Sequence, residues 1–243
     1  MPHLILDIGN TRSKLAVIND GAVVDVKAVD SLDSKLVADV CCQYEIDAAI
    51  ASVVGPKPDF DAVIPNNLKS RFHLLSYRSN LPVAIDYDTP ETLGMDRVAA
   101  AVGARELSES LDPLLIVDAG SCITIDLLDQ HNVFRGGAIA PGLRMRFRAL
   151  HDFTAALPLV KPDDAFDSLY GRNTNGSILA GVMKASVLEI QGFADSYKSI
   201  FPSLKLFLTG GDAVFFAKRL FFPNFANPNL VYIGLDKILK MNI

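Results

Sequence analysis

Two short turns in this sequence place a carboxylate, a glycine and a small polar side chain directly after an apolar run. The first is Asp7-Ile8-Gly9-Asn10 and the second is Asp118-Ala119-Gly120-Ser121. Glycine permits a positive φ in a tight turn and lets a ligand approach the backbone closely. Successive backbone N–H groups in such a turn can bind a phosphate group. Two turns of this kind could hold one polyphosphate from both sides.

The aspartates of these turns need a separate explanation, because a carboxylate beside phosphates is repelled unless a cation lies between them. Mg²⁺ takes oxygen ligands and usually keeps several of its waters, so Asp7 is a candidate to organise a hydrated Mg²⁺ ion. The alternative is that Asp7 and Asp118 only accept hydrogen bonds within their own turns. The matched positions of the two turns favour the first interpretation.

A third glycine cluster, Thr209-Gly210-Gly211-Asp212, follows an apolar run and precedes a helical pattern. Two residues without side chains at this point would let a flat ring and a ribose approach the backbone. Strand-to-helix turns often carry glycine, so this cluster alone does not identify a nucleotide site.

The order of the predicted elements repeats in the two halves of the chain. The first half predicts strands at residues 3–8, 14–18, 22–29, 48–54 and 72–77 and helices at 32–44 and 89–108. The second half predicts strands at 114–118, 123–128, 132–139 and 204–208, helices at 143–157 and 177–200, then a helix and a short apolar segment at 231–233. The D-x-G-[NS] turn follows the first strand of each half, which indicates a duplicated unit with a boundary near residues 111–113.

Composition limits the classes of function. The chain has 243 residues, of which 50% are hydrophobic, so a substantial core is expected. A net charge of −5 disfavours nucleic acid as the main partner, and Arg144, Arg146 and Arg148 are spread around a helix instead of forming a basic patch. Three cysteines give no disulfide framework. No secretion signal or apolar run of about 20 residues is visible, so we expect a soluble cytoplasmic protein without a membrane partner.

Taken together, the motifs resemble those of type III pantothenate kinases, in the superfamily of acetate and sugar kinases, actin and heat-shock chaperones. The resemblance spans nearly the whole chain in the order of the family. It is carried by Asp7-Ile8-Gly9-Asn10-Thr11, Gly94-Met95-Asp96-Arg97, Val117-Asp118-Ala119-Gly120-Ser121, Gly136-Gly137-Ala138-Ile139-Ala140-Pro141-Gly142-Leu143 and Thr209-Gly210-Gly211-Asp212, with Arg172-Asn173-Thr174 before a helix.

This resemblance implies an α/β fold of two duplicated ribonuclease H-like (actin-like ATPase) domains, residues 1–112 and 113–243. Each domain would contain a mixed five-stranded sheet flanked by helices, with a cleft between the domains. The implied reaction is transfer of the ATP γ-phosphoryl group to the 4′-hydroxyl of pantothenate, the first step of coenzyme A biosynthesis. The implied requirements are ATP, Mg²⁺ and a monovalent cation (K⁺ or NH₄⁺), and the implied assembly is a homodimer.

The resemblance also assigns roles to residues. The first ATP phosphate loop would be Asp7, Ile8, Gly9, Asn10, Thr11, Arg12, Ser13 and Lys14, with Ser121, Gly210 and Gly211 as further ATP contacts. Asp118 would bind K⁺. Pantothenate would contact Tyr87, Gly94, Met95, Asp96, Arg97 and Thr174. The family usually has Thr-Ala where this chain has Ser121-Cys122; serine keeps the hydroxyl, and we expect Cys122 to serve packing.

Asp96 is the expected general base, because a carboxylate beside the acceptor hydroxyl can take its proton during phosphoryl transfer. The alternative is a carboxylate that only stabilises the N-terminus of a helix. Arg97 could bind substrate oxygens or form an ion pair, and Tyr87 could cover the substrate or only pack. Thr174 could reach the amide or carboxylate of the substrate, or could cap a helix.

Other functions of the same fold remain open at this point. An ATP-driven actin-like or chaperone-like switch would hydrolyse ATP without pantothenate, but such proteins usually carry additional subdomains. A catalytically inactive regulatory member would not need Asp7, Asp96 and Asp118 together with both glycine-rich turns. A sugar kinase is compatible with the fold alone, whereas residues 94–97 favour pantothenate.

Overall fold

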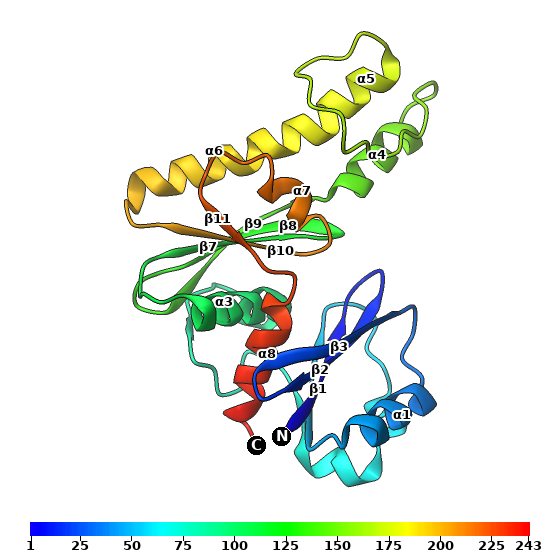
Figure 1. Cartoon of the computed structure of the whole chain (residues 1–243), viewed down its shortest axis with the longest axis vertical. Helices are drawn as coiled ribbons and strands as arrows, with labels where there is room; N and C mark the ends of the chain where they lie inside the picture. The colour runs from blue at the N-terminus through cyan, green and yellow to red at the C-terminus, as the bar shows by residue number, and fades with distance from the viewer. The chain divides into compact units, whose positions relative to one another are not determined.

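The computed structural model describes residues 1–243, which form two compact units. The first unit contains Met1–Leu111, Leu128–Gly136 and Asn229–Ile243, and the second contains Asp112–Leu127 and Gly137–Pro228. The chain therefore leaves the first unit after Leu111 and returns to it twice. Figure 1 shows the mixed α/β character of both units.

The first sheet has five strands in the order β3-β2-β1-β4-β5. These are Ala22–Val29, Ser13–Asn19, Pro2–Ile8, Ala48–Val53 and Phe72–Leu74. The hairpins β1–β2 and β2–β3 are antiparallel, whereas β1–β4 and β4–β5 are parallel. The central strands β1 and β4 read as continuous apolar runs because both faces of the sheet are covered.

One face of this sheet packs on α1 (Ser34–Tyr44), which contributes Val37 and Val40 to a core with Leu4 and Leu6. The alternate residues face α3 (Met95–Leu107) and α8 (Leu230–Lys240), which contact the central strands. In Figure 1 α1 (blue) and α8 (red) lie on opposite sides of the sheet. Asp7 follows the pattern of Ile5 and therefore lies on the face covered by α3 and α8.

Helices α3 and α8 pack at very short range. A Cβ added to Gly103 would lie 2.0 Å from the Leu230 carbonyl oxygen, and one added to Gly234 would lie 1.8 Å from that of Ala99. The small residues of the run 98–104 allow this close approach of the two helices. The start of β1 is joined to α8 by a buried contact of 2.6 Å between His3 Nδ1 and Asp236 Oδ1.

The second sheet has six strands in the order β11-β10-β7-β8-β9-β6. They are Asn224–Ala226, Lys205–Thr209, Leu114–Ala119, Cys122–Leu128, Val133–Pro141 and Ala84–Ile85. The expectation of five strands was one too low, because β6 pairs in parallel with Val133 and Phe134 at the start of β9. Without β6, strands β7–β11 repeat the order and connectivity of β1–β5, which supports the predicted duplication.

The helices of the second unit are α4 (Leu143–Asp152), α7 (Ala213–Ala217) and a continuous helix from Thr174 to Ile200. That helix comprises α5 (Thr174–Leu179), a π-helical turn (Ala180–Lys184) and α6 (Ala185–Ile200). It is long and apolar enough to meet the length and composition criteria for a membrane span, contrary to the sequence expectation. However, it packs Val182, Val187 and Ile190 into the core of the unit, and buried core helices meet the same criteria.

Several element boundaries differ from the expectation. The helix expected at residues 89–108 divides into a 3₁₀ turn (Pro90–Thr92) and α3, because Gly94 forms the N-cap of α3. The expected strand at 72–77 ends at Leu74, and the helix expected to reach residue 157 ends at Asp152. The apolar segment at 231–233 belongs to α8. Helix α2 (Phe60–Val63) and a 3₁₀ segment (Asn66–Arg71) complete the first unit.

Candidate active site

Asp7 is the penultimate residue of the apolar strand β1, beside polar residues on both neighbouring strands. Lys14 is its register partner on antiparallel β2, and Ser52 is its partner on parallel β4. Burial raises the pKa of Asp7 to about 6; Lys14 opposes this rise and the charge of Asp96 adds to it. A carboxylate in this setting favours a nearby cation, because a cation offsets both the burial and the repulsion.

The carboxylate of Asp96 occupies the first turn of α3. Asp96 Oδ1 accepts a hydrogen bond of 2.9 Å from the Arg97 backbone N–H. A Cβ at Gly94, the N-cap, would lie 2.7 Å from the same oxygen, so glycine provides the space for this conformation. The electrostatic effect of Asp96 on Asp7 shows that the first unit brings these two predicted site residues together.

The first predicted phosphate loop is a tight turn between β1 and β2. The Gly9 N–H donates to the Arg12 carbonyl oxygen at 3.2 Å, and residues Asn10, Thr11 and Arg12 are exposed at the tip. Gly9 does not adopt a positive φ, so that expectation was wrong. Glycine is needed here for close packing: a Cβ on Gly9 would lie 2.9 Å from the Arg12 carbonyl oxygen.

Tyr87 and Arg97 lie together in the first unit, as expected for two residues of one site. The Arg97 guanidinium carbon is 6.0 Å from the centre of the Tyr87 ring and 5.8 Å from that of Phe134. Arg97 is only 6% exposed, although it carries a charge. A buried guanidinium close to two aromatic rings has a fixed position, and its positive charge there can attract an anion.

In the second unit, Asp118 lies at the carboxyl end of β7 beside the loop at residues 209–212. Asp118 pairs in register with Thr209, and the Asp212 N–H donates to the Ala119 carbonyl oxygen at 2.9 Å. Gly210 has φ +89°, and a Cβ there would lie 2.4 Å from Asp118 Oδ1. The structure therefore brings the second phosphate loop and the third glycine cluster together at one edge of the sheet.

Gly120 and Ser121 form the turn that follows Asp118. The Gly120 N–H donates to the Cys122 carbonyl oxygen at 2.9 Å, and Gly120, like Gly9, lacks the expected positive φ. Ser121 is exposed and Cys122 is half-buried. Gly142 packs directly on the turn, because a Cβ there would lie 2.4 Å from the Gly120 carbonyl oxygen. The Pro141-Gly142 motif thus supports the second loop.

Thr174 begins α5 in the second unit and is exposed. It does not cap the helix: the N-cap is Asn173, whose side chain accepts a hydrogen bond of 2.8 Å from the Gly176 N–H. The capping alternative for Thr174 was therefore wrong, and its hydroxyl is accessible for a ligand. The residues assigned to pantothenate are thus divided, with Tyr87 and residues 94–97 in the first unit and Thr174 in the second.

The three arginines of α4 have separate environments within the chain. Arg146 forms an ion pair with Glu189 at 2.5 Å and donates to the Pro141 carbonyl oxygen at 2.7 Å. Arg148 lies 3.7 Å from Asp152. The side chain of Arg144 lowers the pKa of Asp212, although burial raises that pKa more strongly. These contacts agree with the expectation that the arginines do not form one basic patch.

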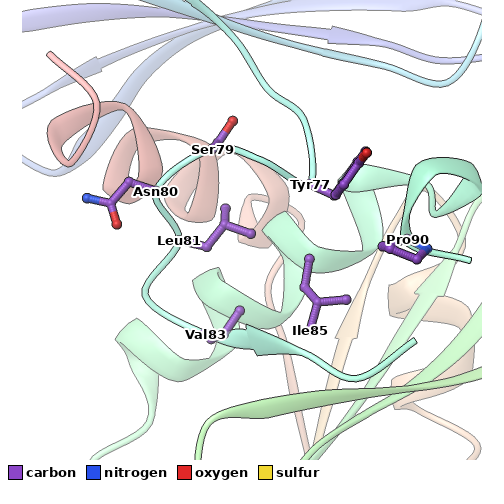
Figure 2. Close-up of a pocket in the computed structure, with 7 residues that line it drawn as sticks. All are labelled: Tyr77, Ser79, Asn80, Leu81, Val83, Ile85 and Pro90. Carbon is purple, nitrogen blue, oxygen red and sulfur yellow. The ribbon is translucent and has the colours of Figure 1, made fainter. Parts of the chain in front are cut away.

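A surface pocket of about 370 Å³ lies on the segment that precedes Tyr87. Figure 2 shows this segment and the seven residues that line the pocket: Tyr77, Ser79, Asn80, Leu81, Val83, Ile85 and Pro90. Its polar groups are already engaged, since Ser79 Oγ bonds to His73 and to the Ser76 N–H, and Asn80 bonds to Asn242. None of the predicted site residues lines it, so we do not assign the substrate to this pocket.

Several residues that shape the site have no role assigned from the sequence, although Gly136 stands in one of the family motifs. Strand register places Ser52 opposite Asp7, and Phe134 contacts the Arg97 guanidinium. Gly136 has a positive φ. Gly55 contacts the first turn, because its Cβ would lie 2.2 Å from the Gly9 carbonyl oxygen. The Gly-Gly and Gly-Pro dipeptides were visible in the sequence and could have identified Gly136 and Gly55 as points of close backbone approach.

The oxygen ligands present fit the implied cations in chemical type. No three His, Cys, Asp or Glu side chains lie close enough to hold a metal ion by themselves. Mg²⁺ in kinases is typically bound by one or two carboxylates, waters and substrate phosphates, and Asp7 with the nearby Asp96 provides carboxylates of this kind. At Asp118 the carboxylate lies beside the carbonyl oxygen of Ala119, the donor type that suits a monovalent cation.

The duplicated sheets, with an aspartate turn after the first strand of each, define an α/β fold of the actin-like ATPase class to which many small-molecule kinases belong. Solved structures of this fold are similar over nearly the whole chain. A glucokinase from an Antarctic psychrotroph has a TM-score of 0.55 at 12% identity, covering 98% of both chains. A Campylobacter jejuni protein named as a Baf family transcriptional activator has a TM-score of 0.62 at 22% identity, covering 98% of both chains.

Sequence comparison identifies the family. The sequence-family model of the type III pantothenate kinases matches residues 3–196 of this chain. The type III pantothenate kinase of Cytophaga hutchinsonii is 38% identical over 241 residues, covering 99% of this chain and all of the relative. That of Bacteroides fragilis is 39% identical over 245 residues, covering 99% and 98%. This chain belongs to the type III pantothenate kinase family.

Proposed function

We propose that this chain transfers the γ-phosphoryl group of ATP to the 4′-hydroxyl of pantothenate, the first step of coenzyme A biosynthesis. The main support is family membership over the full length of the chain. It agrees with the position of Asp7 at the end of the central strand β1, where the charge of Asp96 in α3 raises the pKa of Asp7. The same membership disfavours an actin-like switch or an inactive regulatory protein.

Asp96 acts as the general base in this proposal. Its carboxylate accepts the proton of the pantothenate hydroxyl as the bond to phosphorus forms. The first turn of α3 fixes the carboxylate through the Arg97 N–H, which limits the conformations that Asp96 loses on reaching the transition state. Arg97 contributes a fixed positive charge for the substrate or for the transferred group.

The nucleotide contacts are proposed on both units. The turn at residues 7–14 binds phosphate oxygens with its backbone N–H groups and with Lys14, while Ser121 donates a hydroxyl from the second turn. Gly210 and Gly211 allow the adenosine to approach the backbone. Asp7 holds waters of Mg²⁺ and Asp118 binds K⁺ or NH₄⁺. When bound, these cations neutralise charge on the transferred phosphate.

Pantothenate contacts Tyr87, Gly94, Met95, Asp96, Arg97 and Thr174 in this proposal. Tyr87 and Arg97 form a wall of one aromatic ring and one cation, which suits a substrate with a carboxylate and an aliphatic body. We also propose that the enzyme is a cytoplasmic homodimer and that residues 1–112 and 113–243 are its two duplicated domains, consistent with the repeated sheet order.

The test is an assay of ADP formation with pantothenate, glucose or glycerol as the acceptor, each with and without K⁺. ADP is expected to form only with pantothenate and to require Mg²⁺, with a higher rate when K⁺ or NH₄⁺ is present. Phosphopantothenate identified by mass spectrometry would confirm the acceptor. ADP release at the same rate without any acceptor would favour a switch, and phosphorylation of glucose would favour a sugar kinase.

A further inference from the structure

Tyr87 follows a very short strand that has little to hold it in place. Strand β6 consists of Ala84 and Ile85 only, which pair with Val133 and Phe134 of β9. The ladder ends with a hydrogen bond of 3.0 Å from the Asp86 N–H to the Phe134 carbonyl oxygen. A two-residue ladder alone is a weak constraint, so the position of Tyr87 requires additional contacts.

One such contact is an ion pair made by the residue before Tyr87. Arg135 Nη1 lies 2.5 Å from Asp86 Oδ2, and Arg135 Nε and Nη2 each lie 2.8 Å from Asp129 Oδ2. Arg135 therefore links Asp86, in the segment between β6 and α3, to Asp129, in the turn between β8 and β9. Arg135 contacts each carboxylate through a single oxygen, and since the Asp86 side chain is 65% exposed, its link to Arg135 is the weaker of the two.

Asp129 is a firm anchor for this link. It is 5% exposed and accepts hydrogen bonds from the backbone N–H groups of His131 at 2.8 Å and Val133 at 2.9 Å. Burial acts to raise the pKa of Asp129, but the hydrogen bonds from Val133, Arg135 and His131 outweigh it and hold the pKa below its usual value. Asp129 is thus an ionised residue with a fixed position in the β8–β9 turn. Arg135, held by Asp129, in turn restricts the movement of Asp86.

The second contact is made by the ring of Tyr87 itself. Gly136 has φ +80°, and a Cβ at this position would lie 3.0 Å from Tyr87 Cε2 and 3.1 Å from Cδ2. The ring therefore packs against the bare backbone of β9. Phe134, two residues earlier, is fully buried, and the Arg97 guanidinium lies over both aromatic rings. A side chain at residue 136 would be strained at this φ and would push the Tyr87 ring away by a few tenths of an ångström.

We propose that Arg135 and Gly136 are positioning residues that hold Tyr87 in the acceptor site, Arg135 by fixing Asp86 and Gly136 by admitting the ring. This proposal rests on the proposed function, in which Tyr87 and Arg97 contact pantothenate. All the residues concerned belong to the first unit. The sequence assigned neither role, since both depend on the pairing of β6 with β9.

The kinetic test compares Gly136→Ala and Arg135→Gln with the parent enzyme. Gly136→Ala is expected to raise the KM for pantothenate by at least about tenfold, because a displaced ring loses its contact geometry. Arg135→Gln is expected to raise it by about threefold to tenfold, since the backbone ladder remains. The KM for ATP should stay within about twofold in both variants, as the nucleotide contacts are elsewhere.

A double-variant cycle separates positioning from general damage. In a Tyr87→Ala background there is no ring to displace, so adding Gly136→Ala is expected to change the pantothenate KM by less than about twofold. Arg78→Gln is the matched control, because Arg78 also lies over a tyrosine ring, that of Tyr77 at 5.3 Å, but outside this cluster. An unchanged KM in Gly136→Ala, or a full effect in the Tyr87→Ala background, would overturn the proposal.

A spectroscopic test does not depend on the identity of the substrate. The chain contains six tyrosines and no tryptophan, so ¹⁹F NMR of fluorotyrosine-labelled protein gives few resonances, and Tyr87→Phe identifies that of Tyr87. Gly136→Ala and Arg135→Gln are expected to shift this resonance, while Arg78→Gln leaves it unchanged. If the resonance moves but pantothenate gives no ADP, the proposed function fails and the packing is correct. If it stays in place, the positioning role fails; should Gly136→Ala not fold, Arg135→Gln decides.

Discussion

The two aspartate turns occupy equivalent places in the duplicated sheets but differ in what surrounds them. Strands β1 and β4 pair in parallel, as do β7 and β10, and in each case the aspartate faces a buried hydroxyl residue across the ladder. Asp7 pairs with Ser52 and Asp118 pairs with Thr209, both 1% exposed. This shared register shows that the framework of the two turns comes from the duplication.

The differences come from the elements that pack at the ends of these strands. Asp7 has Lys14 across the hairpin and the charge of Asp96 nearby, so burial and repulsion raise its pKa to about 6. Asp118 has the bare Cα of Gly210 and the backbone oxygen of Ala119 beside it. The first turn therefore has two carboxylates that could organise a cation, whereas the second combines one carboxylate and a carbonyl oxygen with a glycine that permits close backbone approach.

The largest expected effect is that of Asp96→Asn, which removes the second carboxylate near Asp7 in the first unit. If Asp96 is the general base, kcat should fall by about 10²–10⁴-fold. The fold should persist, because an amide oxygen can still accept the hydrogen bond of the Arg97 N–H. Steady-state ADP formation and a thermal melt measure the two quantities. A kcat near that of the parent enzyme would leave Asp96 with only a helix-stabilising role.

The next effect is expected in the second unit, from Gly210→Ala. A methyl group there would meet Asp118 Oδ1 at 2.4 Å, and the φ of +89° disfavours any other residue. Displacing Asp118 and its turn should raise the KM for ATP by at least about tenfold, with less effect on the KM for pantothenate. Gly192→Ala in α6 is the matched control, since its Cβ would meet no atom within 4 Å. An unchanged ATP KM in Gly210→Ala would separate this loop from the nucleotide site.

Asp7→Asn tests whether the buried charge of Asp7 makes the stability of the folded protein depend on pH. Because the folded-state pKa of Asp7 is raised from 3.8 to about 6, the folded protein binds the proton more tightly than the unfolded chain. The parent protein therefore loses stability as the pH rises from about 4 to about 6, and the loss is complete above pH 6. Asn at this position carries no charge and should avoid the loss.

Urea unfolding without nucleotide or Mg²⁺ measures this difference. The free energy of unfolding of Asp7→Asn should exceed that of the parent by about 1–3 kcal/mol above pH 6, and the two should converge near pH 4. Asp118→Asn provides the comparison with the second turn. A parent protein that is as stable as Asp7→Asn at pH 7.5 would show that Lys14 fully compensates the buried carboxylate.

Most of the fold could be predicted because its central strands are apolar, regular and bounded by glycine turns. Strands β6 and β11 could not, since two or three residues carry no periodicity of their own. Helix α8 was missed because it begins with four consecutive apolar residues, Leu230 to Ile233, a run that periodicity alone does not distinguish from a short strand.

The site was predictable only where residue type alone carries the chemistry. Asp7, Asp96 and Asp118 stand out as carboxylates two residues from a glycine, and the structure places Asp96 close enough to Asp7 to raise its pKa. The surroundings of these residues were not predictable. Ser52 reaches Asp7 only through the parallel register of β1 and β4, and Gly136 reaches Tyr87 only through β6. Such long-range register is not encoded in any local pattern of the sequence.

The smallest expected effect is that of Ser52→Ala, the residue that faces Asp7 across the ladder. The Ser52 hydroxyl is buried and has no hydrogen-bond partner in the protein. Removing it breaks no bond, so the free energy of unfolding should change by less than about 1 kcal/mol. Ser186→Ala is the matched control, because the buried Ser186 hydroxyl donates to the Val182 carbonyl oxygen at 2.7 Å and should lose more. A larger loss of stability in Ser52→Ala than in Ser186→Ala would mean that Ser52 makes a polar contact through a bound water. The first turn would then have a polar contact beside its aspartate, and Thr209→Val would test whether the second turn has one as well.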